Sequence, residues 1–344
     1  MSQLKWGFVV LAAIALAGTM GCTSKEKEAA PAEGAAVVEE KVAVVAEEPL
    51  KPLPELGELN MEKVALGRKL FHDTILSGDG TLACSTCHTL DHGGAEPRKT
   101  SKGIRGQLGP INSPTVLNSS LNFVQFWDGR ARDLREQAEG PVANPIEMGA
   151  TWEGVVKRLE GNAKYVAEFK ALYEDGITKN NITDAIAVYE EALITPSRFD
   201  KYLMGDQNAI TDAEKKGYET FKAVGCPTCH NGVLIGGGMF QKMGLVNDYF
   251  KDRGTEVTEA DLGRFNVSKN PAEKHFFKVP TLRNVELTPP YLHDGSRATL
   301  EETVRVMGKY QLGRDLTEAE INSIVTFLKS LTGELPPYAR LPGT

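Results

Sequence analysis

Cys84-Ser85-Thr86-Cys87-His88 and Cys226-Pro227-Thr228-Cys229-His230 are the two stretches of sequence that decide the fold. In each, two cysteines are separated by two residues and a histidine follows at once. This pattern is typical of c-type haem attachment, in which both sulfurs form thioethers with the porphyrin and the histidine ligates the iron. Zinc ribbons and redox cysteine pairs share the cysteine spacing but do not need the adjacent histidine. The sequence therefore predicts two covalently attached haems, with His88 and His230 as proximal iron ligands.

Length and composition fit a chain with two domains. The chain has 344 residues, of which 41% are hydrophobic, so each of two domains can bury a core. Beyond the N-terminus, no apolar run is long enough for a membrane span, which argues against a polytopic membrane protein. The net charge of -7 argues against a nucleic-acid partner.

The N-terminus predicts export. Residues 1–21 read as a signal, with Lys5 before an apolar stretch that is too short to span a bilayer comfortably. The fifth cysteine, Cys22, follows small residues, as at a bacterial lipoprotein cleavage site. Either Cys22 becomes a lipid anchor, or the signal is an ordinary one and Cys22 is incidental. Both alternatives place the protein in the periplasm, tethered to the membrane only in the first.

The remaining chain is expected to comprise a tether, two related units and a tail. Residues 22–55 are rich in Ala, Glu, Val and Pro and predict a flexible tether. The expected boundaries of the other parts are 56–200 for the first haem domain, 205–335 for the second and 336–344 for the tail.

Helical patterns occur at matching places in the two units. A helix is expected before each haem motif, over 61–71 in the first unit and from a capping box at Thr211…Glu214 in the second. Each unit is also expected to end in a helix, over 183–195 and over 317–331. Strand signals are few. The fold class is therefore predicted to be mostly α, with two cytochrome c-like domains and long loops that wrap each haem.

Four further stretches make the chain resemble the bacterial dihaem cytochrome c peroxidases across residues 56–335. They are Gly109-Pro110-Ile111-Asn112-Ser113-Pro114-Thr115, Gln125-Phe126-Trp127-Asp128-Gly129-Arg130, Val279-Pro280-Thr281-Leu282-Arg283-Asn284 and Pro290-Tyr291-Leu292-His293-Asp294-Gly295. The resemblance implies reduction of hydrogen peroxide to water. It also implies that electrons from a small cytochrome c or copper protein enter at the C-terminal haem and pass to the N-terminal, peroxidatic haem. Family members are usually homodimers.

The resemblance assigns different surroundings to the two haems. Met307 matches the distal ligand of the C-terminal haem, although a Met in the helical pattern 300–307 is otherwise more often a core residue. Gln137 and Glu147 match the distal pocket of the peroxidatic haem, where a carboxylate can move a proton between the peroxide oxygens and an amide can orient them. Trp127 matches a tryptophan between the haems that resembles an electron conduit.

A calcium site is implied by the resemblance alone. Asn112, Thr288 and Pro290 match residues that hold calcium in the family. An amide oxygen and backbone carbonyls suit this hard cation. No acidic cluster marks the site in the sequence.

The chain departs from the family at one loop. Many members have a loop histidine that ligates the peroxidatic iron in the oxidised state, and Ile104 occupies that position here. His92 is the other histidine nearby, but an extended chain covers only about 13 Å in four residues, so its reach from His88 round the haem edge is short. Two alternatives follow: an open iron, or ligation by His92. His293 is expected to hydrogen-bond near the C-terminal haem, and His72 and His275 to be surface or core residues.

Three other functions remain open. A pure electron carrier would keep both haems but needs no acid–base pair such as Glu147 and Gln137. An enzyme that oxidises a protein substrate, like the dihaem relative that matures a tryptophan-derived quinone, has Tyr where Met307 stands. A lipid-anchored haem scaffold for partner docking would need no catalytic residues.

Overall fold

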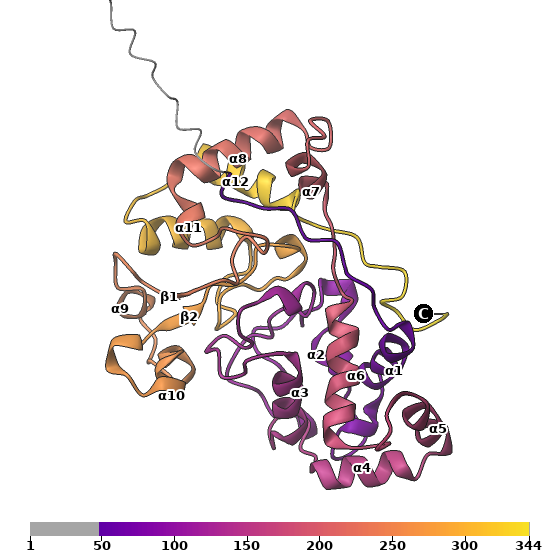
Figure 1. Cartoon of the computed structure of the whole chain (residues 1–344). Coiled ribbons are helices and arrows are strands. Elements are labelled where there is room, and N and C mark those ends of the chain that lie inside the picture. The colour runs from indigo at the N-terminus through magenta and orange to yellow at the C-terminus, as the bar shows by residue number, and fades with distance from the viewer. Residues whose placement is uncertain (1–47, 344) are drawn as a thin grey trace, which may run out of the picture. The chain divides into compact units, whose positions relative to one another are not determined.

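The computed structural model describes residues 48–343, which are mostly helical, as predicted (Figure 1). Within these residues, no helix has both the length and the apolar character needed to cross a bilayer. The predicted signal, Cys22 and most of the predicted tether lie outside the described residues. The α-helices are α1 (Met61–Phe71), α2 (Cys84–Cys87), α3 (Leu134–Ala143), α4 (Trp152–Glu160), α5 (Ala163–Leu172), α6 (Lys179–Glu191), α7 (Arg198–Leu203), α8 (Asp212–Val224), α9 (Tyr249–Arg253), α10 (Phe265–Ser268), α11 (Leu300–Gln311) and α12 (Glu318–Lys329).

One small sheet and several short 3-10 helices lie between these helices. Strands β1 (Phe240–Lys242) and β2 (Phe276–Lys278) are antiparallel, with Phe240 opposite Lys278. The 3-10 helices are η1 (Thr74–Leu76), η2 (Leu90–His92), η3 (Ile104–Gly106), η4 (Ser119–Leu121), η5 (Cys226–Thr228), η6 (Ala260–Leu262), η7 (Pro271–Glu273) and η8 (Val285–Leu287). Most of the chain that follows each haem motif is therefore loop, as the sequence predicts.

Two helix pairs of the same construction form the frame. Helix α1 packs on α6 in the first half, and α8 packs on α12 in the second. Both contacts need a glycine, because a Cβ on Gly67 would lie 1.8 Å from the Ala185 oxygen and one on Gly217 would lie 2.2 Å from the Ser323 oxygen. Each pair has its own apolar core, the first including Phe71 and the second including several aromatic rings around Phe327. The described chain thus contains the duplicated helical plan.

The ends of these helices follow the capping signals closely. Helix α1 has the predicted bounds, and the predicted capping boxes of Thr211 with Glu214 and Thr317 with Glu320 are both present. Helix α6 begins at Lys179 rather than at residue 183, because the Thr178 side chain accepts a hydrogen bond from the Asn181 amide. It ends at Glu191 and not at residue 195.

A five-residue motif recurs after each haem motif. Pro114-Thr115-Val116-Leu117-Asn118 and Pro280-Thr281-Leu282-Arg283-Asn284 both end in an Asn with φ 59°, and a 3-10 helix follows each. Asparagine tolerates this left-handed conformation better than most residues. The repeat means that the loops as well as the helices are duplicated.

The two motifs meet at a single buried side chain. Thr195 Oγ1 accepts hydrogen bonds of 2.8 Å from both Asn118 Nδ2 and Asn284 Nδ2. The Thr195 amide donates to Asn118 Oδ1, and the Gly333 amide donates to Asn284 Oδ1. Thr195 is fully buried. This Asn–Thr–Asn junction therefore ties the two repeats together directly.

The segments at both ends of the described chain cross between the halves. Leu50 is 1% exposed in the core of the second half, and the Leu53 amide donates to Asp200 Oδ1 at 2.7 Å. The predicted flexible tether over 22–55 is therefore wrong around Leu50 and Leu53, which are buried although the composition of the longer segment is that of a linker. At the other end, Tyr189 donates to the buried Ala339 carbonyl in the first half, so the predicted tail is also packed.

Candidate functional site

The first haem motif presents a histidine with one free ring nitrogen. Cys84–Cys87 forms the single turn α2, and His88 Nδ1 lies 3.2 Å from the Gly94 carbonyl oxygen. Because a carbonyl can only accept, Nδ1 carries the proton and Nε2 keeps its lone pair. Burial lowers the pKa of His88, although the carbonyl contacts oppose this shift. The ring is therefore a neutral imidazole suited to ligate a metal.

The second haem motif repeats this arrangement. His230 Nδ1 lies 3.2 Å from the Ile235 carbonyl oxygen, and burial lowers the pKa of His230 to about 4. The recurring threonines fix the neighbouring carbonyls, since Thr115 Oγ1 donates to Gly93 O at 2.6 Å and Thr281 Oγ1 donates to Leu234 O at 2.7 Å. Both rings are thus held by loops of the same design.

The cysteines fit thioether attachment better than metal binding through sulfur. Burial raises the pKa of Cys84, Cys87 and Cys226 to about 12, which disfavours the thiolate that zinc requires. The described part of the chain has one clustered group of potential metal ligands, and it contains no cysteine. Half-buried cysteines beside a free histidine nitrogen fit a covalently bound haem.

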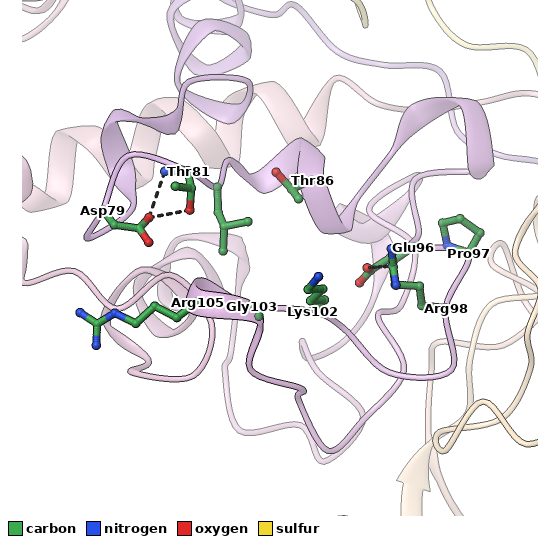
Figure 2. Close-up of a pocket in the computed structure, with 11 residues that line it drawn as sticks. Asp79, Thr81, Thr86, Glu96, Pro97, Arg98, Lys102, Gly103 and Arg105 are labelled. Carbon is green, nitrogen blue, oxygen red and sulfur yellow. Dashed lines mark hydrogen bonds and ion pairs between the residues drawn. The ribbon is translucent and has the colours of Figure 1, made fainter.

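A cavity of about 470 Å³ lies beside the first motif. In Figure 2, Thr86 of the motif is on one side of it, and Glu96, Lys102 and Arg105 are around the rest. Glu96 is 7% exposed, and its Oε2 has no hydrogen-bond partner while Oε1 pairs with Arg98. An open space with unsatisfied polar and basic groups fits a bound haem at this motif.

Glu147 is a half-buried carboxyl group next to this first site. It follows helix α3, whose fourth residue is the half-buried Gln137. Burial raises the pKa of Glu147, while the charge of Arg130 and a 2.8 Å hydrogen bond from Asn144 Nδ2 oppose the rise. Its charge reaches Cys87 of the haem motif, where it contributes to that thiol's raised pKa. The raised pKa makes Glu147 a stronger base than an exposed glutamate.

The loop that contains Ile104, where the chain departs from the family, is hydrogen-bonded to the segment that carries Glu147. The Ile104 amide donates to the Glu147 carbonyl at 2.7 Å, and Ile104 is 3% exposed. A Cβ on Gly103 would lie 1.9 Å from the Ile146 oxygen, so the backbones touch. The position therefore presents a buried aliphatic side chain, which cannot ligate iron.

His92 lies on the same side as the proximal loop. It is exposed and ends the 3-10 helix η2, within the turn that brings the Gly94 carbonyl to His88. Reaching the opposite face of the haem would require this turn to unwind. The placement of His92 favours the open-iron alternative.

Met307 and Pro141 occupy equivalent places in the two halves. Each is the eighth residue of its helix, Pro141 in α3 and Met307 in α11. Met307 packs against an apolar cluster that contains Phe277. Trp127 packs against the same cluster. A thioether can ligate iron and a proline cannot, so the two halves differ where a distal ligand is expected.

Trp127 connects elements of both halves. Its Nε1 donates to the Asn112 carbonyl at 2.9 Å, and its ring makes edge contacts with Phe277 at 6.4 Å and His293 at 6.5 Å. The tryptophan therefore packs against the same apolar cluster as Met307, and its role between two haems stays a prediction.

Asn112 and Thr288 of the predicted calcium site make hydrogen bonds to other residues and not to each other. Asn112 is buried, and its Nδ2 donates to the Arg98 carbonyl at 2.9 Å. Thr288 donates to the Val285 carbonyl, and Pro290 follows a cis peptide bond. The calcium site stays a prediction.

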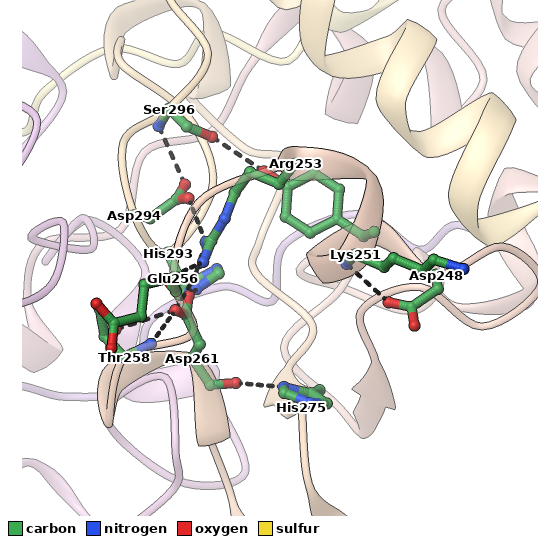
Figure 3. Close-up of polar contacts among 11 residues, drawn as sticks. Asp248, Lys251, Arg253, Glu256, Thr258, Asp261, His275, His293, Asp294 and Ser296 are labelled. Atoms are coloured by element: carbon green, nitrogen blue, oxygen red, sulfur yellow. Dashed lines mark hydrogen bonds and ion pairs between the residues drawn. The ribbon is translucent and has the colours of Figure 1, made fainter.

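A buried ionic network was not predicted from the sequence (Figure 3). Asp261 Oδ1 accepts from His293 Nε2 at 2.8 Å, and Arg253 donates to both oxygens of Asp261 and to Asp294. Burial would raise the pKa of Asp261, but these donors outweigh it and hold that pKa well below its usual range. Because Arg253 already pairs with both Asp261 and Asp294, the group is an ion-pair network rather than a cation site.

The other histidines behave as core residues. His275 Nδ1 lies 2.8 Å from the Asp261 carbonyl, and its ring stacks on Phe250. His72 is half-buried beside Phe71 and Tyr189. Both positions agree with the expectation of surface or core residues. The carboxylate partner of His293 is Asp261, which the sequence did not indicate.

The fold and site together define a mostly helical protein in which a C-x-x-C-H motif occurs twice in matching surroundings. Residues 61–208 match the model of the di-haem cytochrome c peroxidase family. The chain is 48% identical to a cytochrome c551 peroxidase of Nitrosomonas europaea, over 87% of this chain and 88% of that protein. It is also 48% identical to a cytochrome c peroxidase of Escherichia coli, over 85% of this chain but 62% of the longer relative.

A solved structure agrees with these relatives. The crystal structure of a MauG-like protein associated with microbial copper homeostasis superposes with a TM-score of 0.75 at 28% identity, covering 88% of this chain and 99% of that one. The chain belongs to the di-haem cytochrome c peroxidase family.

Proposed function

We propose that this protein reduces hydrogen peroxide to two molecules of water, with electrons from a small periplasmic cytochrome c or copper protein. The observation that carries this proposal is the difference between the matched halves. The second half offers Met307 where the first has Pro141, and the first has the half-buried carboxyl Glu147 beside its haem motif. The second half is therefore suited to store an electron, and the first half is suited to bind and cleave peroxide.

Two residues of the first half have separate roles toward peroxide: Glu147 transfers a proton and Gln137 orients the molecule. When bound, the haems supply the electrons that cleave the peroxide bond, with Cys84, Cys87 and His88 holding one and Cys226, Cys229, His230 and Met307 the other. Glu147 takes the proton from the inner peroxide oxygen and delivers it to the outer one, which then leaves as water. The Gln137 amide orients the peroxide by hydrogen bonding.

Electrons enter at the second half and reach the first through Trp127. Its contacts with the cluster around Met307 and its hydrogen bond to Asn112 support this route. Calcium at Asn112, Thr288 and Pro290 would fasten the same region. Export through residues 1–21, attachment at Cys22 and a homodimer belong to the proposal as well.

The test is a peroxide assay on the haem-loaded protein in its fully oxidised and half-reduced forms. We expect turnover with a reduced small cytochrome, and turnover of the oxidised form without a lag if the first iron is open. No peroxide consumption in either form would contradict the proposal. Rapid electron exchange with the donor but no consumption would identify an electron carrier instead.

A further inference from the structure

Lys278 is a buried cation on strand β2. The residue is 7% exposed, and its Nζ donates a 3.0 Å hydrogen bond to Asn122 Oδ1. No carboxylate of residues 48–343 pairs with it, and burial alone lowers its pKa to about 8. A neutral amide oxygen satisfies one of the three ammonium protons and none of the charge.

Other buried cations of this chain have a carboxylate partner. Arg283, with a fully buried side chain, pairs with Asp200 at 2.8 Å, and Arg253 pairs with Asp261 at 2.8 Å. An unpaired buried ammonium is strongly unfavourable, so such groups are normally paired or hydrogen-bonded to anions. Residues 48–343 therefore provide no anionic partner for Lys278, and a bound group could supply one.

The strand that carries Lys278 leads to the loops around His230 of the second haem motif. Its amide donates to the Trp127 carbonyl at 2.8 Å. Two residues further along, the Pro280 oxygen lies 2.2 Å from where a Cβ on Gly236 would be, and that same point is 3.3 Å from His230 Nδ1. Strand β2 thus runs from the Trp127 segment directly to the loops that hold His230.

The direction of the side chain follows from the strand. Successive side chains of a strand point to opposite faces, and Phe277 packs in the apolar cluster beside Met307. Lys278 consequently faces the other way, toward Asn122 of the first half. Asn122 Oδ1 is also 2.7 Å from the Cβ position of Gly237, next to the His230 loop.

We propose that Lys278, positioned by Asn122, binds a propionate carboxylate of the haem attached at Cys226 and Cys229. This inference rests on the presence of two haems in the chain and not on peroxide turnover. A propionate of the haem would supply the carboxylate that Lys278 does not find in the described residues. The ammonium in turn favours the reduced state of that haem, because a nearby positive charge stabilises an added electron. Lys278 is thus a positioning and potential-setting residue.

The test is a redox titration of the haem-loaded protein, followed optically for each haem and carried out without peroxide. We expect Lys278→Met to lower the ratio of reduced to oxidised second haem at a fixed ambient potential by about tenfold. Coulomb's law gives an effect of about this size for a unit charge roughly 12 Å from the iron at an effective dielectric of about 20. Lys278→Arg keeps the charge and should restore most of the ratio.

Lys242→Met is the matched control, because Lys242 is an exposed lysine on the partner strand β1. It should leave both haems unchanged. If Lys278→Met takes up haem poorly, Lys278→Gln decides, since glutamine still donates to Asn122 but carries no charge. A second-haem potential in either neutral variant equal to that of Lys242→Met would overturn the proposal. Loss of peroxidase turnover alone would not affect it, because the titration involves no peroxide.

Discussion

Single hydrogen bonds decide the chemistry at the two haem motifs. The Gly94 and Ile235 carbonyls each hold one nitrogen of a histidine ring, which leaves the other nitrogen free for iron. Equivalent residues then diverge on the opposite side, where Pro141 and Met307 differ. The proposed functional asymmetry therefore rests on one difference inside a duplicated frame, together with the half-buried carboxyl Glu147.

The role of Glu147 can be tested by removing its charge. Glu147→Gln should reduce peroxide turnover by about 10²- to 10⁴-fold, the usual loss when a general base is removed. The haem spectra should stay unchanged, since the amide has nearly the same shape. Glu139→Gln, at a half-exposed residue of α3 that pairs with Lys179, is the control.

The acid limb of the pH profile gives a second readout for the same residue. Glu147 must be ionised to accept a proton, and its pKa is raised by burial. Activity should therefore fall with decreasing pH already above the ordinary carboxyl range, and this limb should vanish in Glu147→Gln. A wild-type turnover rate in that variant would exclude Glu147 as the base.

The sequence predicted those features whose interacting residues are close together in the chain. The two haem motifs and the threonine capping boxes involve neighbours in sequence, and the structure shows both boxes. Arg253 and Asp261 gave no such signal, because their partners His293 and Asp294 come from a distant loop. Lys278 was missed for the same reason, since burial is a tertiary property.

At the scale of elements, the loop around Ile104 decides the resting state of the first haem. It is held by the bond from the Ile104 amide to Glu147 and by the close contact of Gly103 with Ile146. Both contacts use backbone atoms and leave the identity of the side chain at 104 free. The same loop fold can therefore carry either an aliphatic residue or a ligand.

Ile104→His should convert an open site into a ligated one. We expect the wild-type ferric spectrum to show a first haem that is not six-coordinate and low-spin, and the variant to gain a low-spin signal. The variant should then turn over peroxide only after half-reduction. Ile104→Val is the control that keeps an aliphatic side chain. Clean low-spin signals from both haems of the wild-type protein would refute the open site.

Helix and loop predictions differed in accuracy for a physical reason. Apolar periodicity located α1 with its observed bounds, but the start of α6 was placed late because its capping residue, Thr178, precedes a polar first turn. Residues 48–55 were assigned to the tether because composition cannot show that Leu50 enters a core contributed by residues far along the chain. Long-range packing is the part that the sequence did not reveal.

At the scale of the whole molecule, a segment at each end of the described chain packs in the half formed mainly by the other end. Residues near Leu50 pack in the second half, while residues near Ala339 pack in the first. The Asp200 carboxylate links the Leu53 amide to Arg283, so the first of these segments is fixed by a buried ion pair. The halves are consequently expected to unfold together rather than as independent domains.

The Asn–Thr–Asn junction provides the test of this coupling. Thr195→Val keeps the shape of the side chain but removes the oxygen that accepts from Asn118 and Asn284. Two buried amide donors lose their partner, at about 1–3 kcal/mol each, so the free energy of unfolding should fall by about 2–6 kcal/mol.

Denaturant unfolding of the haem-loaded protein, followed separately at the two haems, measures this loss. Thr195→Ser should restore most of the stability. Thr326→Val, at a half-buried threonine whose hydroxyl donates only within α12, should change little. Because one oxygen serves both repeats, the two haem signals should shift together in Thr195→Val. A shift confined to one haem would show that the junction supports only its own half and that the halves fold separately.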